Sequence, residues 1–185
     1  EGSSGFYDAI VLGRRASYTL QWVFERPGDE THQAIIKDSC FTTPLWICPE
    51  QEEGRKNVLV CVDGSDNSFR AVDHTGFIVS RQDQHAIVLF HVESGTGQDI
   101  DEIFRQAKAI LHDHQIGDER ITCASTWGLS VPGAIQGEIA KGSYGAVALG
   151  LRGLEYGFLK DLNLAGGTTA KLINRLEKTS IWCCP

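Results

Sequence analysis

Glycine, threonine and basic residues between positions 150 and 169 have the types and spacing of a phosphate-binding loop. They are Gly150, Arg152 and Gly153, followed after twelve further residues by Gly166, Gly167, Thr168 and Thr169. Because an apolar run enters this stretch and a helix-compatible run leaves it, free backbone N–H groups and the positive end of a helix dipole face the loop. Such an arrangement favours a bound phosphate. The alternative is that the glycines only form turns.

Other chemically suggestive residues have simpler interpretations. The turn that begins at Asp63 resembles the start of a calcium loop, but its twelfth position is His74 instead of glutamate, which favours a turn and helix cap. His112 and His114 are two apart on a predicted helix and so point to different faces. His91 ends a predicted strand, and we interpret it as a structural histidine. No serine, histidine and acid cluster can be assembled, so we predict no catalytic residue and no metal site.

Composition limits the classes of function that fit. The chain has 185 residues, of which 42% are hydrophobic, and a formal net charge of −7. This acidic balance argues against binding to nucleic acid or to a membrane surface, which requires a basic face. Six cysteines without a Cys-x-x-Cys pair indicate buried, reduced thiols in a cytoplasmic protein. No apolar run is long enough to cross a bilayer.

The elements that position the loop alternate in type from Asn57 onward. The predicted strands are 57–62, 86–92, 121–125, 144–149 and 181–184, and the predicted helices are 69–80, 99–115, 131–141 and a last one from Thr168. Strands that are apolar throughout and alternate with helices predict a parallel sheet covered on both faces. We therefore expect an α/β domain with a doubly wound, five-stranded parallel sheet.

The start of the chain repeats its end. Residues 7–16 align with 144–153, and residues 43–49 align with 179–185. We predict three parts: 1–50 as the last part of a degenerate first repeat, 51–56 as a linker, and 57–185 as a complete domain. A strand-helix-strand fragment cannot bury its own apolar face. We therefore expect a missing upstream portion, or docking on the second copy or another chain.

The first repeat has lost the features that suit a phosphate. Ala16 stands where the second copy has Gly153, and Asp29 follows Gly28 at the predicted start of a helix. A carboxylate beside a phosphate is repulsive. The first copy is therefore not expected to bind a nucleotide, and Asp29 is interpreted as a helix-start residue.

In order, these segments resemble the universal stress protein family. Residues 58–68 resemble that family's opening strand with its Asp-Gly-Ser turn, and 88–92 its second strand. Residues 128–132 resemble the approach to its third helix. Residues 144–153, then Gly166 onward, resemble its nucleotide loop. The resemblance covers 57–185 fully and 6–49 as a partial first copy.

The resemblance implies an adenine-nucleotide fold with strand order 3-2-1-4-5, in which ligands bind where the order reverses. Asp63 then ends strand 1 opposite Gly150 at the end of strand 4. It implies ATP, with or without Mg²⁺. The implied binding residues are Val62, Asp63 and Val92, then Gly150, Arg152 and Gly153 in the loop, and Gly166, Gly167, Thr168 and Thr169 around the phosphates.

The loop departs from the family pattern in three ways. Twelve residues instead of nine separate Gly153 from Gly166, and Gly167 stands where a serine or threonine is usual. Glu155 and Asp161 add negative charge, which Lys160 offsets in part. Each departure weakens the expectation of ATP binding, although a longer loop can still bind a phosphate through backbone donors.

Three functions follow as hypotheses. The first is a regulatory stress protein that binds or senses ATP and is not an enzyme, with slow ATP hydrolysis left open. The second is a dimerising scaffold of the same family without a nucleotide. The third is an enzyme of the wider adenine-nucleotide α-hydrolase-like fold. In all three, the final strands, 44–49 and 181–184, are expected to pair with each other or with a copy in another chain, because an unpaired sheet edge invites pairing.

Overall fold

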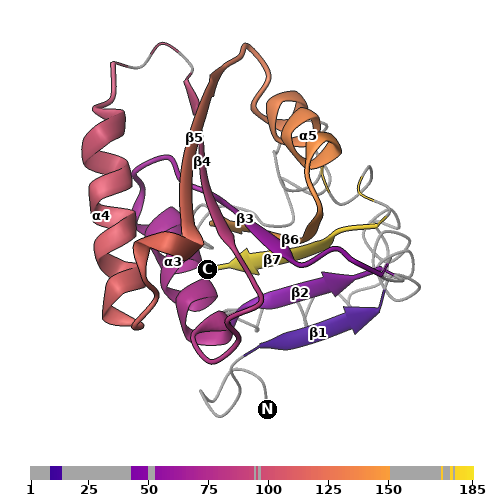
Figure 1. Cartoon of the computed structure of the whole chain (residues 1–185). Coiled ribbons are helices and arrows are strands. Elements are labelled where there is room, and N and C mark those ends of the chain that lie inside the picture. Colours follow the sequence, from indigo (N-terminus) through magenta and orange to yellow (C-terminus); the bar gives the residue numbers. More distant parts are fainter. Residues whose placement is uncertain are drawn as a thin grey trace, which may run out of the picture.

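A twisted, mostly parallel sheet runs through the molecule and carries helices on both faces (Figure 1). This computed structural model describes residues 9–13, 43–49, 53–93, 95, 97–150, 172, 176 and 178–185. The strands are β1 (Ile10–Gly13), β2 (Leu45–Cys48), β3 (Asn57–Cys61), β4 (Ile87–Glu93), β5 (Ile121–Trp127), β6 (Tyr144–Gly150) and β7 (Ser180–Cys184). The helices are α3 (Asp66–Val79), α4 (Ile100–Asp113) and α5 (Val131–Lys141), with a short 3₁₀ turn, η1 (Asp118–Arg120).

Short polar side chains fix where the three helices begin. Ser65 accepts from the Ser68 N–H at 3.3 Å before α3, and Asp99 and Ser130 cap α4 and α5 in the same way. Each cap satisfies a backbone donor that the first helical turn leaves unpaired. α3 therefore begins at Asp66, three residues before the predicted start at Phe69.

The strand order agrees with the expectation for the second part of the chain. β5, β4, β3, β6 and β7 are neighbours in that order and pair in parallel, which is the order 3-2-1-4-5. The sheet is wider than the predicted five strands, because β2 pairs antiparallel with β7 and β1 pairs parallel with β2. The described sheet therefore has seven strands. The edge of β7 is thus paired with β2 of the same chain.

The β1–β2 pair repeats the register of the β6–β7 pair. Ile10 pairs with Leu45 as Val147 pairs with Ile181, and Gly13 pairs with Cys48 as Gly150 pairs with Cys184. These are the positions that align in the sequence repeat. The predicted helix at 29–37 lies outside the described residues.

The seam between β2 and β7 is centred on two tryptophans. Trp46 is paired with Trp182, and their rings stack with centroids 4.4 Å apart and planes 11° from parallel. The indole N–H of Trp46 also donates to Nε2 of His74 on α3 at 3.0 Å. The predicted pairing of 44–49 with 181–184 is thus present within the chain, and α3 is hydrogen-bonded to β2 as well as packed against β3, β6 and β7.

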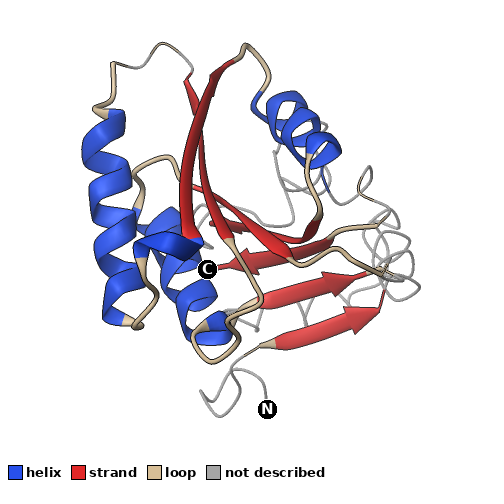
Figure 2. Ribbon diagram, viewed as in Figure 1, coloured by secondary structure: helices blue, strands red, loops and turns tan. Residues whose placement is uncertain are grey.

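Apolar residues fill the space on both faces of the sheet, with α3 and α4 on one side and α5 on the other (Figure 2). Consecutive strand residues point to opposite faces. Val58 and Val60 pack on the side of α3 and α4, whereas Leu59 packs on the side of α5. Cys183 and Cys184 likewise lie on opposite faces, and both are buried.

Candidate functional site

The turn after β3 holds the first predicted site residue, Asp63. This exposed carboxylate accepts from the Ser65 N–H at 3.0 Å and from the Ser65 hydroxyl at 2.5 Å, both on Oδ1. Between them, Gly64 has φ of +80°, a left-handed conformation that favours glycine. The Asp-Gly-Ser sequence therefore forms one turn whose side chains fix its shape and lead directly into α3.

Gly150, the last residue of β6, lies against the first turn of α3. A Cβ at this position would stand 2.5 Å from the Asn67 carbonyl oxygen and 2.6 Å from the Ser68 nitrogen. A residue with a side chain cannot occupy that space unless the backbone moves. β6 and β3 are neighbours in the sheet, so the end of β6 lies near the helix that follows β3. Because Gly150 has no side chain, the backbones of β6 and α3 can come into contact there.

The end of β4 supplies the third part of this edge. Val62 is buried and Val92 is half-buried. His91 is 2% exposed, and its Nδ1 lies 2.8 Å from the Val62 carbonyl oxygen. This contact agrees with the interpretation of His91 as a structural histidine. It also links the end of β4 to the turn that carries Asp63.

The structure therefore brings four predicted residues to the carboxyl ends of three adjacent strands. These are Val62, Asp63, Val92 and Gly150. The other six predicted residues, Arg152, Gly153, Gly166, Gly167, Thr168 and Thr169, lie outside the described residues.

Acidic groups and helix starts meet at this edge. Asp63 follows β3, Glu93 ends β4, and Asp66 and Asp99 lie at the starts of α3 and α4. Burial, and to a smaller extent the Asp63 carboxylate, raise the pKa of the Cys61 thiol, so this thiol stays protonated at neutral pH. The helix N-termini attract anions, whereas the carboxylates repel them. The edge therefore suits an anion of low charge or one neutralised by a cation.

Sequence reasoning did not single out Gln98 as part of this edge. Its side-chain amide donates to the Asp63 carbonyl oxygen at 2.8 Å. Gln98 lies 35 positions from Asp63 and carries no motif of its own, so only the fold reveals the contact. Ser68 donates to the Ser65 carbonyl at 2.8 Å. It follows Ser65 by three residues, which is the spacing of a helix cap, and this was a weak indication in the sequence.

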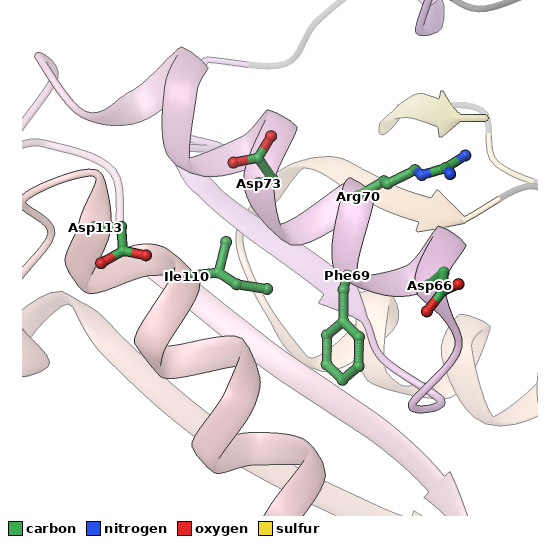
Figure 3. A pocket seen from close by; sticks show the side chains of 6 residues that line it. All are labelled: Asp66, Phe69, Arg70, Asp73, Ile110 and Asp113. Carbon is green, nitrogen blue, oxygen red and sulfur yellow. The ribbon is translucent and has the colours of Figure 1, made fainter.

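A shallow hollow of about 400 Å³ lies between α3 and α4. Figure 3 shows its lining side chains: Asp66, Phe69, Arg70 and Asp73 from α3, and Ile110 and Asp113 from α4. Within this lining, Asp73 Oδ1 lies 2.7 Å from Nε2 of His114. Of its lining residues, Asp66 at the start of α3 also lies at the edge with Asp63 and Gly150, and the others lie further along the two helices.

Two histidines near the end of α4 and the vicinal cysteines of β7 are further candidates for chemistry. His112 and His114 contact different acids, Asp118 and Asp73. Within the part of the chain that the structure describes, no three acidic, histidine or cysteine side chains form a group that could bind a metal. Burial raises the pKa of Cys183 to about 12 and raises that of Cys184 as well, so neither is a reactive thiolate at neutral pH. None of the helices in the described ranges has the length and hydropathy needed to span a bilayer.

Comparison with protein-family models gives no match, and comparison with curated proteins gives none either. Solved structures do match. A universal stress protein in complex with cAMP aligns with 70% of this chain and 95% of its own, at 21% identity and a TM-score of 0.56. A universal stress protein from Archaeoglobus fulgidus DSM 4304 aligns with 98% of this chain, at 16% identity and a TM-score of 0.60. This chain spans 63% of that second protein's length. The likeness shows that the chain has the fold of universal stress proteins.

Proposed function

We propose that this chain is a member of the universal stress protein family and binds an adenine nucleotide at the carboxyl ends of β3 and β6. The observation that carries the proposal is the contact of Gly150 with the first turn of α3, beside the Asp63 turn. The strand order reverses between β3 and β6. Ligands of doubly wound sheets bind at such a switch point. The motifs at both strand ends resemble those of the family.

The roles assigned to individual residues follow the motif. Val62, Asp63 and Val92 would lie against the adenosine, and Gly150, Arg152 and Gly153 would begin the loop around the ligand. The phosphates would be bound by Gly166, Gly167, Thr168 and Thr169. Backbone N–H groups would supply most of the donors, and a threonine hydroxyl can donate to a phosphate oxygen or ligate Mg²⁺.

Two adenine nucleotides are candidates. The motif resemblance favours ATP, and Mg²⁺ would offset repulsion from the acidic residues at this edge. Cyclic AMP is the second candidate, because a protein of the same fold was solved in complex with cAMP. It carries about one negative charge against about four on ATP at neutral pH, so Asp63, Asp66 and Glu93 would repel it less.

The proposed role is regulatory and cytoplasmic, and we assign no reaction to the chain. Nδ1 of the nearby His91 contacts the Val62 carbonyl oxygen, and we assign no residue the role of a general base. Slow ATP hydrolysis is left open. The alternative is a scaffold of the same family that binds no nucleotide and self-associates through 44–49 and 181–184.

We further propose that residues 1–50 are the last part of a first, degenerate repeat, joined through 51–56 to the complete domain at 57–185. Two observations support this organisation. β1 and β2 pair in the register of β6 and β7. The longer solved neighbour aligns with 98% of this chain, whereas the shorter aligns with 70%.

Calorimetric titration of the full chain tests the proposal. ATP, Mg-ATP and cAMP are titrated separately, with Mg-GTP as the control for base recognition. We expect saturable binding of at least one adenine nucleotide and weaker binding of GTP. An absence of binding to all adenine nucleotides at millimolar concentration would contradict the proposal and favour the scaffold.

A further inference from the structure

The backbone of the Asp63 turn is held by groups from three different elements. The Val62 N–H donates to the Phe90 carbonyl of β4 at 2.9 Å, and the Val62 carbonyl contacts His91 Nδ1 at 2.8 Å. The Asp63 N–H donates to the Ser68 hydroxyl of α3 at 3.4 Å. The Asp63 carbonyl accepts from the Gln98 amide at 2.8 Å. All four polar backbone groups of the two residues thus have a protein partner.

Gln98 differs from the other partners because it comes from an exposed connection, the β4–α4 loop. It directly precedes Asp99, whose side chain caps α4 at the Glu102 N–H, 3.1 Å away. Gly95 and Gly97, on its other side, have left-handed φ values of +77° and +68°. Gln98 therefore directly precedes the capped start of a helix and follows a glycine with a left-handed backbone.

The Gln98 amide and Ile103 of α4 lie beside Gly64. A Cβ on Gly64 would stand 3.2 Å from Ile103 Cδ1 and 3.7 Å from Gln98 Nε2. The turn is therefore packed against α4 and hydrogen-bonded to the β4–α4 loop. A change in the position of this loop would change the position of the Asp63 carbonyl.

We propose that Gln98 is a positioning residue for the nucleotide site. Its side-chain amide holds the Asp63 carbonyl in place and couples the β4–α4 loop to the turn against which the nucleotide binds. This inference rests on the proposed function. It adds to the site a residue that belongs to no sequence motif. It also implies that the position of the β4–α4 loop changes the affinity for the nucleotide.

The test combines amide hydrogen exchange with nucleotide titration in Gln98→Ala. The Ser65 N–H is the reporter, because it donates to the Asp63 carboxylate inside the turn. Loss of one neutral hydrogen bond should speed its exchange about two- to tenfold and weaken adenine-nucleotide binding by a similar factor. The melting temperature should change by less than about 2 °C, since Gln98 is exposed.

Two variants separate positioning from a general effect of substitution. Gln106→Ala removes another exposed amide, one that donates to Glu102 on its own helix at 2.6 Å, and should leave both readouts unchanged. Gln98→Lys keeps a long side chain with a donor and should restore slow exchange at Ser65.

The outcomes distinguish this inference from the proposed function. Unchanged Ser65 exchange in Gln98→Ala would overturn the inference. Faster exchange with an unchanged nucleotide affinity would overturn the positioning role. If the wild-type chain binds no adenine nucleotide, the proposed function and the nucleotide role of Gln98 both fail. The exchange data would then still show whether Gln98 holds the turn.

Discussion

Gly150 and Asn67 are in contact through their backbones. A Cβ on Gly150 would stand 2.5 Å from the Asn67 carbonyl oxygen, which is far inside the van der Waals limit. This contact places the end of β6 at the start of α3, where backbone N–H groups and the helix dipole favour an anion. The glycine at position 150 is therefore required by packing as well as by the loop that follows it.

Gly150→Val should destabilise the chain and abolish nucleotide binding. Forcing a side chain into this space should cost about 1–3 kcal/mol of unfolding free energy. For a chain of this size, each kcal/mol lowers the melting temperature by about 2–4 °C. Gly137→Ala is the matched control, because a Cβ there meets nothing within 4 Å and alanine is the better helix former. Equal stability of the two variants would contradict the packing argument.

Much of the fold was predictable because its signals are local. Continuous apolar strands such as residues 58–62 and well-spaced caps such as Ser65 predict the alternation of elements from Asn57 onward. The sheet order followed from the family resemblance. By contrast, the sequence left open whether β2 would pair with β7 inside the chain or with a copy in another chain, because an exposed edge can pair with either.

Trp46→Phe tests the hydrogen bond between Trp46 on β2 and His74 on α3. Phenylalanine keeps a ring to stack on Trp182 but loses the N–H that donates to His74. Loss of this part-buried hydrogen bond should lower the unfolding free energy by about 0.5–1.5 kcal/mol. Trp127→Phe is the control, since Trp127 is 66% exposed and should change stability by less than about 0.5 kcal/mol. Chemical denaturation gives both values, and similar losses would refute the role of this bond.

Arg120 should contribute more to stability than an ordinary surface arginine. Its guanidinium donates to the carbonyls of Val79, Gln82 and His85 at 2.9–3.1 Å, and its side chain is 11% exposed. Arg120→Ala should cost about 3 kcal/mol, and Arg120→Lys should recover little because lysine lacks the planar fork. Arg105→Ala, which removes an exposed pair with Glu102, should cost less than about 1 kcal/mol. A lysine variant as stable as wild type would contradict this account.

Stability should fall above pH 10 because of Tyr144. Burial, together with the hydrogen bond to Glu138 at 3.1 Å, raises the pKa of this phenol to about 12. The folded state therefore keeps a proton that the unfolded state loses at about pH 10, and the stabilisation is lost between about pH 10 and 12. The difference in phenolate absorbance between wild type and Tyr144→Phe isolates this group. A midpoint near 10 would be inconsistent with the buried, bonded phenol.

The candidate site was predictable only in part, for a reason that Gln98 illustrates. Asp63 and Gly150 are marked by motifs, because a tight turn and a close backbone approach require particular residue types. Gln98 carries no such mark, since any long side chain with a donor at that position in the fold can reach the Asp63 carbonyl. Contacts between distant segments that place no demand on local sequence are revealed by structure alone.

The most direct test of the central claim is to map nucleotide binding onto backbone amide resonances of the full chain. On addition of Mg-ATP or cAMP, we predict the largest shifts at Asp63, Gly64, Val92 and Gly150, and small shifts at Asp73 and Ile110 in the hollow between α3 and α4. Unchanged resonances at Asp63 and Gly150 in the presence of millimolar nucleotide, or shifts confined to the hollow, would contradict the claim that an adenine nucleotide binds where β3 and β6 end.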